Sequence, residues 1–299
     1  MCRLFGMSGG HERVRATFWL LDAPDSLALQ SRREPDGTGL GAFTATGGPR
    51  IDKQPLAAYE DAAFGREARE VDSRTFVAHV RYASNGGLTM ANTHPFLQSG
   101  RIFAHNGVIG DVPRLESELG EAMALVDGDT DSERFFALIT REIERAGDVA
   151  AGIATACQWV AAHLPVLSLN FVLITDEELW ALRYPDTHDL FVLERPAGGA
   201  GGGQRHLEHA SARGSIRVRS GDLAGRAAVV VASERMDADD GWREIAPGEL
   251  IHVGPDLDVD RVQLLDGPPA HPLTLAELDP KAAASQAAPP PATPTADRG

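Results

Sequence analysis

Residues 1–7 of the chain read Met-Cys-Arg-Leu-Phe-Gly-Met, an apolar run that predicts a β-strand over residues 3–7 with a cysteine immediately before it. Removal of the initiator methionine would make Cys2 the amino-terminal residue. A thiol is a nucleophile when ionised, and an α-amino group, with an unperturbed pKa of about 7.7–8.0, is a base that works near neutral pH. One residue could then supply both the nucleophile and its proton acceptor, directly or through one water. The alternative is that Cys2 is an incidental residue at a frayed terminus.

The composition is that of an acidic globular protein. Of the 299 residues, 43% are hydrophobic, and the formal net charge is −15. No dense run of Lys and Arg is present, so nucleic acid and anionic membrane surfaces are excluded as partners, and small molecules or proteins are favoured. Cys2 and Cys157 are the two cysteines, which argues against a disulfide framework and for a reducing compartment. Because no apolar run could span a bilayer and no secretory signal opens the chain, a cytoplasmic protein is expected.

Apolar runs typical of strands alternate with helical stretches. Besides the opening strand, the predicted strands are 75–82, 101–104, 167–175, 179–184, 190–193, 216–218, 227–231 and 249–253. Apolar residues at spacings of three and four predict helices over 131–146 and 149–164, packed as an antiparallel pair. Two helices between two blocks of strands favour sheets packed face to face with helices outside.

Two segments lack the pattern of regular structure. The glycine-dense run 196–203 is typical of a flexible loop between strands. Residues 281–299 contain no aliphatic side chain larger than alanine after the first lysine, which predicts a disordered Ala/Pro-rich tail.

The segment His105-Asn106-Gly107 has two interpretations. Asn-Gly is typical of a tight turn with positive φ, so a hairpin tip explains it without any function. The functional interpretation is an oxyanion hole, in which the Asn106 side-chain amide and the Gly107 backbone N–H converge on one developing negative charge. Loss of one such donor typically costs roughly 3–4 kcal/mol of transition-state stabilisation.

Two charged residues have the chemistry needed to hold an α-amino acid. Arg81 ends an apolar strand, and its guanidinium could bind a carboxylate in a bidentate manner or simply form a surface ion pair. Asp131 opens the first predicted helix and could hold an ammonium group. Thr130 and Glu133 also fit a capping box, in which Asp131 would be an ordinary first-turn acid.

His94, in Asn92-Thr93-His94-Pro95, is a further candidate for orienting a substrate or shaping a pocket, although a lone loop histidine is more often structural. The histidines do not form metal-ligand spacings, since His206 and His209 lack a neighbouring cysteine or carboxylate pattern. No phosphate-binding glycine pattern follows a strand. Neither a metal nor a cofactor is therefore expected.

Together these residues provide a nucleophile, a base, an oxyanion hole and clamps for a carboxylate and an ammonium group. On these features the chain resembles the class II glutamine amidotransferases, which are N-terminal nucleophile hydrolases. The resemblance covers about residues 2–255, and its motifs, in the family's order, are Cys2 with its strand, Pro35-Asp36-Gly37, His79-x-Arg81, Asn92-Thr93-His94-Pro95, His105-Asn106-Gly107 and Thr130-Asp131-Ser132-Glu133. A later segment is similar to the stand-alone branch that includes the γ-glutamyl hydrolase of ergothioneine biosynthesis: Ala232-Ser233-Glu234, Gly241-Trp242-Arg243-Glu244 and Pro247-Gly248-Glu249-Leu250.

The resemblance implies an α+β fold, the four-layer αββα sandwich of the N-terminal nucleophile hydrolases. It implies that Cys2 attacks the γ-amide of glutamine or of a γ-glutamyl conjugate and forms a thioester. Asn106 and Gly107 would bind the oxyanion, Arg81 the α-carboxylate and Asp131 the α-ammonium group.

The chain departs from the family at one wall of the expected pocket. Many family members have Trp-Ala-Thr-His-Gly after the arginine, whereas this chain has Tyr82-Ala83-Ser84-Asn85-Gly86. Ser84 can still donate a hydroxyl hydrogen bond. Asn85 in place of histidine alters the wall, and with it the preference between free glutamine and larger γ-glutamyl compounds.

The expected organisation is a glutaminase-type domain over residues 2–255, a C-terminal extension over 256–280 and the tail. So short a remainder does not predict a second catalytic domain, so either a separate ammonia-accepting synthase is the partner or the reaction ends in hydrolysis. Two other function classes stay open: a catalytically silent glutamine-binding or regulatory subunit that docks on a separate synthase, and an amidase acting on a non-glutamyl amide, for which Arg81 would be dispensable.

Overall fold

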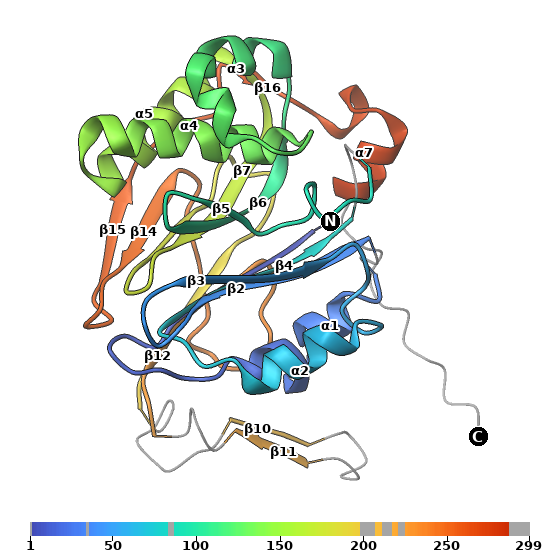
Figure 1. The fold of residues 1–299 in the computed structure, drawn as a ribbon, viewed down its shortest axis with the longest axis vertical. Coiled ribbons are helices and arrows are strands. Elements are labelled where there is room, and N and C mark those ends of the chain that lie inside the picture. Colours follow the sequence, from blue (N-terminus) through green and yellow to red (C-terminus); the bar gives the residue numbers. More distant parts are fainter. Residues whose placement is uncertain are drawn as a thin grey trace.

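The computed structural model describes residues 2–33, 36–82, 87–197, 207–210, 217–220 and 225–286. Within these ranges the chain forms two seven-stranded β-sheets, a separate hairpin of β10 (Leu207–Ala210) and β11 (Arg217–Ser220), and helices on the outer faces (Figure 1). The first sheet has the order β13-β9-β12-β1-β4-β2-β3, with β13 Arg243–Glu244, β9 Phe191–Arg195, β12 Ala228–Ala232, β1 Arg3–Ser8, β4 Thr75–Arg81, β2 Gly37–Phe43 and β3 Pro49–Gln54. The second has the order β15-β14-β8-β7-β6-β5 with β16 paired to β7, and comprises β15 Val259–Gln263, β14 Glu249–Val253, β8 Leu179–Leu182, β7 Pro165–Ile174, β6 Arg101–Ile109, β5 Phe96–Gln98 and β16 His271–Pro272.

Alternating side chains of the strands build three apolar layers. In β1, Phe5 and Met7 belong to the core under the helices of the first sheet, whereas Leu4 belongs to the core between the sheets. In β6, Phe103 packs toward the helices and Ile102 toward the other sheet. Successive side chains of a strand point to opposite faces, so each central strand contributes to two layers. The layers run helix, sheet, sheet, helix (Figure 1), which confirms the predicted αββα sandwich.

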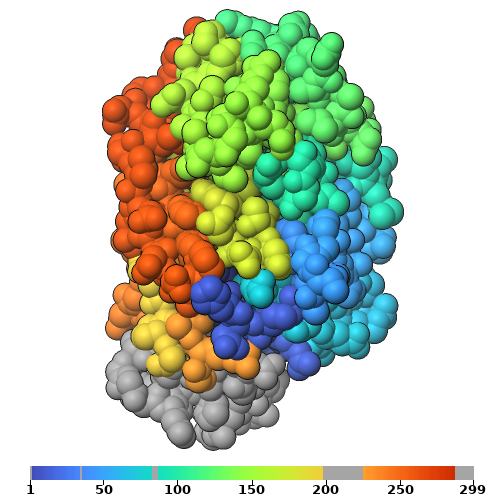
Figure 2. Space-filling view, turned by 60° about the vertical axis from the view of Figure 1, so that its left-hand side comes forward, coloured from blue at the N-terminus to red at the C-terminus, as the bar shows by residue number. Residues whose placement is uncertain are grey.

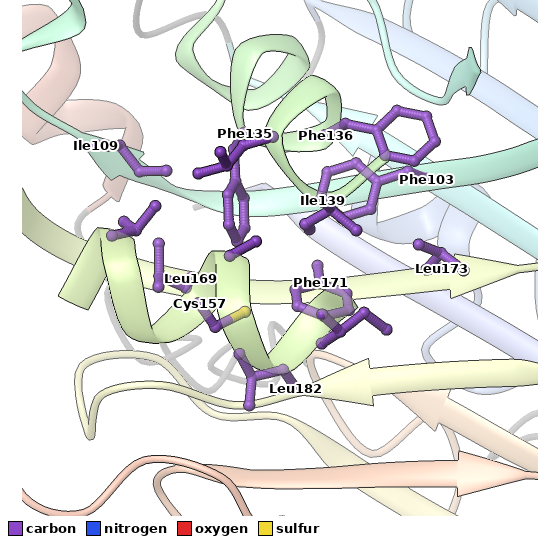
Figure 3. Close-up of a cluster of buried hydrophobic side chains, with 14 of the residues drawn as sticks. Phe103, Ile109, Phe135, Phe136, Ile139, Cys157, Leu169, Phe171, Leu173 and Leu182 are labelled. Atoms are coloured by element: carbon purple, nitrogen blue, oxygen red, sulfur yellow. The ribbon is translucent and has the colours of Figure 1, made fainter. Parts of the chain in front are cut away.

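The outer face of the second sheet is covered by α3 (Val112–Leu119), η2 (Gly120–Leu125), α4 (Asp131–Ala146) and α5 (Val149–His163). Their apolar side chains surround Phe103, whose ring stacks on Phe136 with centroids 4.7 Å apart (Figure 3). Gly147 ends α4 in the left-handed conformation and Asp148 caps α5. Both helices predicted from the sequence are thereby confirmed, the second ending one residue earlier.

The outer face of the first sheet is covered by η1 (Phe18–Asp22), α1 (Leu27–Gln30) and α2 (Ala62–Glu70). Trp19 and Phe64 are buried there in one apolar cluster with Phe5 of β1 and Phe76 of β4. No helix in the described ranges has the length and apolarity needed to cross a bilayer.

The tight-turn interpretation of Asn106-Gly107 is wrong. Both residues lie inside the continuous strand β6, where Asn106 pairs with Asn170 and Gly107 with Leu169 of β7. A Cβ added at Gly107 would collide with the carbonyl of Ser168. Glycine is therefore required here for the close approach of two strands, not for a turn.

The C-terminal part of the chain continues the second sheet and ends in a helix. The segment 256–280 adds β15 and β16 to the second sheet, followed by η3 (Leu275–Glu277). Predicted disorder is wrong for 281–286, because α7 (Pro280–Gln286) buries three side chains and is capped by Asp279, whose carboxylate accepts from the N–H groups of residues 281 and 282. Figure 2 shows the C-terminal segment in orange and red beside the blue N-terminal segment, and one contact between them joins His11 and Asp256 at 3.0 Å. The rest of the predicted disordered tail, residues 287–299, lies outside the described residues. The same holds for 198–203, most of the predicted flexible loop.

Candidate active site

Cys2 stands at the start of β1, a strand flanked in the first sheet by β12 and β4. It is 7% exposed, and the Tyr82 N–H donates to its Sγ at 3.2 Å. The Cys2 carbonyl accepts hydrogen bonds from Asn106 Nδ2 at 3.0 Å and from Arg3 Nη1 at 3.3 Å. These contacts fix the residue from both sheets, so the frayed-terminus alternative is wrong.

A small cavity lies against the Cys2 thiol. Its lining comprises Cys2, Arg81, Tyr82, His94, His105, Gly107, Thr130, Asp131, Ser132 and Gln286. Of the site residues predicted from the sequence, five meet in this cavity: Cys2, Arg81, His94, Gly107 and Asp131. Asn106 touches Cys2 directly through its amide. Ser84 and Asn85 lie outside the described residues.

The donors expected for an oxyanion lie next to the thiol. An Asn amide carries two N–H donors, so Asn106 keeps one after bonding the Cys2 carbonyl. The Ile109 N–H bonds the Asp131 carboxylate at 2.7 Å, on the side of β6 away from β7. Since N–H groups two residues apart on a strand point to the same edge, the Gly107 N–H also points to this edge, beside the cavity.

Asp131 reaches the cavity because α4 begins beside β6. Thr130 caps the helix by accepting from the Glu133 N–H at 3.2 Å. The Glu133 carboxylate accepts from the N–H groups of Asp127 and Gly128 instead of that of Thr130, so the reciprocal half of the predicted capping box is absent from the described contacts. Because Thr130 and Glu133 make these bonds at the start of the helix, the Asp131 side chain is not needed for them. It is 6% exposed and lines the cavity.

Arg81, the last residue of β4, brings positive charge to the same cavity. Its side chain is 4% exposed and donates to the Gly87 carbonyl at 3.4 Å. Burial lowers the pKa of the Arg81 guanidinium, and negative charge on Cys2, Asp36 and Asp131 acts in the opposite direction. The cavity thus carries a cation and an anion on separate elements, as a zwitterionic ligand requires.

Three buried histidines lie at the cavity: His94 and His105 line it, and His79 stacks on His94. His79 and His94 stack with centroids 4.3 Å apart, and burial lowers the pKa of His79 to about 3 and that of His94 well below its usual value. His105 bonds Ser132 Oγ at 2.9 Å and the Ser168 carbonyl at 3.1 Å, and burial lowers its pKa against the opposing effect of Asp131. All three rings are neutral at pH 7, so they shape the cavity wall without adding charge, and the described hydrogen bonds of the group are those of His105.

Several lining residues were not predicted from the sequence. The Tyr82 contact is made by the backbone, which no side-chain motif reveals. His105 and Ser132 belong to the quoted motifs, and their mutual hydrogen bond assigns them a shared structural role. Gln286 lies 284 positions after Cys2 in a segment expected to be disordered, and no local signal marks it.

Comparison with known proteins agrees with this geometry. The family model described as class II glutamine amidotransferases matches residues 1–259. The chain therefore belongs to the class II glutamine amidotransferases, a family of enzymes.

Individual relatives differ in how much of the chain they share. A γ-glutamyl-hercynylcysteine sulfoxide hydrolase of Mycobacterium tuberculosis is 28% identical over 264 residues, which are 85% of this chain and 93% of that protein. A probable glutamine amidotransferase of Saccharomyces cerevisiae is 29% identical over 49% of this chain and 47% of its own length. The chain spans less than half the length of the first curated relatives it matches.

Solved structures show the same fold at low sequence identity. The allosteric regulatory enzyme of purine biosynthesis is 22% identical, with a TM-score of 0.63 over 89% of this chain and 50% of that chain. A glutamine aminotransferase class-II domain protein from Silicibacter pomeroyi is 20% identical, with a TM-score of 0.56 over 87% of this chain and 98% of its own. This likeness shows the fold alone.

Proposed function

We propose that the mature protein hydrolyses the γ-amide of glutamine, or of a γ-glutamyl conjugate, through a thioester on Cys2. One observation carries the proposal: a single buried cavity joins the Cys2 thiol, the Arg81 cation and the Asp131 anion. The hydrolase from M. tuberculosis, by its name, acts on a γ-glutamyl compound, which supports this substrate class.

Removal of Met1, which happens once during maturation, exposes the α-amino group of Cys2. This amine accepts the thiol proton, and Sγ attacks the γ-carbonyl carbon of the substrate. The carbon–nitrogen bond then breaks and the leaving amine takes up the proton. Water attacks the resulting thioester, which releases glutamate and restores the thiol. For glutamine the balance is one water consumed, one glutamate and one ammonia formed.

Hydrogen bonds stabilise the two tetrahedral intermediates. The remaining N–H of the Asn106 amide and the backbone N–H of Gly107 donate to the carbonyl oxygen as it becomes negative; the contact of Asn106 with Cys2 and the place of Gly107 in the cavity lining support this role. Preorganised donors of this kind act without reorganisation and are each worth roughly 3–4 kcal/mol.

Substrate orientation depends on the two charges. The guanidinium of Arg81 binds the α-carboxylate and the carboxylate of Asp131 binds the α-ammonium group, so the γ-amide is presented to Cys2. Ammonia then leaves to solvent or to a separate synthase, and the release of free ammonia distinguishes these fates.

A glutaminase assay with two cysteine variants tests the proposal. Glutamate and ammonia are measured for the mature protein, for Cys2→Ala and for Cys157→Ala, the control at the buried cysteine of α5. We expect Cys2→Ala to lower kcat about a thousandfold or more while it still binds glutamine in calorimetry, and Cys157→Ala to stay within about threefold. Residual activity of Cys2→Ala close to wild type would refute the mechanism. Glutamine binding by the wild type without turnover would instead indicate a silent subunit.

A further inference from the structure

A glutamine side chain from the end of the described chain reaches the Cys2 cavity. Gln286, the last residue of α7, is 2% exposed and lines the cavity together with Cys2. Figure 1 shows α7 beside the N-terminus, on the other side of the molecule from β14 and β15. The cavity therefore has one wall that comes from outside the two sheets and the helix pair.

The Gln286 side chain is held by a buried histidine. Its Oε1 accepts from His188 Nε2 at 2.9 Å, and His188 is 3% exposed. Because an amide oxygen only accepts, His188 carries its proton on Nε2. The His188 carbonyl in turn accepts from Asn170 Nδ2 and from Arg183 Nε, each at 3.0 Å. Gln286 is thus bonded to His188, which is itself held by Asn170 and Arg183 of the second sheet and its border.

The strand order places His188 on the side of Cys2 that is away from Arg81. β1, which begins after Cys2, has β4 with Arg81 as one neighbour and β12 as the other, and β9 follows β12. His188 lies in the connection from β8 to β9, three residues before β9 begins at Phe191. At the edge of the first sheet where β1 begins, Arg81 therefore lies on one side of Cys2, and the contact between His188 and Gln286 lies on the other side.

We propose that Gln286 is a specificity-determining residue that limits the size of the leaving group of the γ-glutamyl substrate. The proposal rests on the proposed function. With the α-carboxylate on Arg81 and the γ-carbon at Cys2 Sγ, the leaving group extends away from Arg81, toward Gln286. Ammonia fits in front of the buried side chain, whereas a bulky amine collides with it. The preferred substrate class is a γ-glutamyl compound with a small leaving group, glutamine first among them.

A series of γ-glutamyl alkylamides measures this limit. Hydrolysis of glutamine and of its N-methyl, N-ethyl and N-butyl amides is compared in the wild type, in Gln286→Ala and in Lys281→Ala, an exposed position on the same helix. Removing the Gln286 side chain is expected to raise the ratio of kcat/KM for the butylamide over glutamine at least about tenfold, the lower end of what one methylene group is worth in a pocket. Lys281→Ala leaves the ratio unchanged. Gln286→Met, which keeps the length of the side chain without its amide, also keeps the ratio near that of the wild type.

A ratio in Gln286→Ala within about twofold of the wild type would overturn the proposal, as would an equal rise in Gln286→Met, because size would then not be the cause. Failure of the wild type to hydrolyse any of the amides would refute the proposed function instead. Calorimetric titration of Cys2→Ala, with and without Gln286→Ala, then decides the inference by itself. Tighter binding of the butylamide in the double variant alone supports it, and equal binding, or no binding in either protein, overturns it.

Discussion

Asp131 offers a sharp test of substrate orientation, because Asp131→Asn removes a charge while keeping a shape. The carboxylate accepts from the Ile109 N–H at 2.7 Å, and an amide oxygen can accept the same bond. We therefore expect the variant to fold, with a loss of about 0.3–1 kcal/mol in the free energy of unfolding from the weaker interaction with the helix dipole. What the variant lacks is the negative charge for the α-ammonium group.

The magnitude follows from the burial of this side chain. Asp131 is 6% exposed, so a hydrogen bond from an ammonium group would be little screened by water. Hydrogen bonds to charged groups contribute about 1.5–3 kcal/mol, and each 1.36 kcal/mol is tenfold in rate, so kcat/KM for glutamine should fall about 10- to 150-fold.

The assay pairs this variant with a control residue and a control substrate. Asp129→Asn makes the same chemical change at an exposed residue two positions earlier and should leave kcat/KM unaffected. Glutaramate, which is glutamine without its α-amino group, should be hydrolysed equally by the wild type and by Asp131→Asn. A loss below about threefold for glutamine, or an equal loss for both substrates, would show that Asp131 does not hold the ammonium group.

Three further outcomes follow from the structure. Gly107→Ala places a methyl group against the Ser168 carbonyl, so urea unfolding should show a loss of about 1–3 kcal/mol, with kcat reduced about a hundredfold; normal activity would contradict the oxyanion role. Arg81→Lys keeps the charge but not the bidentate fork, and KM for glutamine should rise about tenfold; an unchanged KM would remove the carboxylate clamp. Burial lowers the pKa of His79 to about 3, so below pH 6.5 the unfolded chain binds a proton that the folded chain does not, and His79 by itself should lower the stability by about 1.7 kcal/mol between pH 6.5 and pH 5. His79→Phe should remove this share of the pH dependence in thermal melts and leave the share of His94, and the exposed His271→Gln should change nothing; an equal slope in all three proteins would speak against a neutral buried ring.

The predictions from sequence succeed where the signal is local. The helix over Asp131–Ala146 is bounded by Thr130 before it and Gly147 after it, and both boundary residues are visible in the sequence as a cap and a stop. Asp131, Arg81 and Cys2 each stand at the end of an element, where a side chain can face a cavity. The structure brings all three to one cavity, and their roles as a nucleophile and two clamps stay predictions.

The failures come from tertiary contacts that override local preference. Asn106-Gly107 favours a turn, yet pairing with β7 keeps both residues in a strand. The strand β2 was not predicted, because its glycine-rich sequence has weak β propensity; a Cβ at Gly39 would collide with the His94 carbonyl and one at Gly41 with Ile102. Such glycines are selected by close packing that only the folded molecule shows.

The site predicted from the sequence was incomplete because it, too, depends on tertiary contacts. The Tyr82 backbone N–H and the Gln286 side chain reach Cys2 or its cavity through the fold, across 80 and 284 residues of sequence. An alanine-rich segment predicts disorder, whereas α7 uses small side chains to pack closely beside the cavity. A contact of this kind has no periodicity or motif from which it could be predicted.

The intact mass of the purified protein, before and after incubation with a glutamine-mimicking diazoketone, tests directly whether Cys2 is an amino-terminal nucleophile. We expect Met1 to be absent and one equivalent of reagent to be bound. Peptide mapping should place the reagent on Cys2 and not on Cys157, and excess glutamine should protect against the reaction. Retention of Met1, or the absence of an adduct on Cys2, would contradict the assignment of Cys2 as an amino-terminal nucleophile.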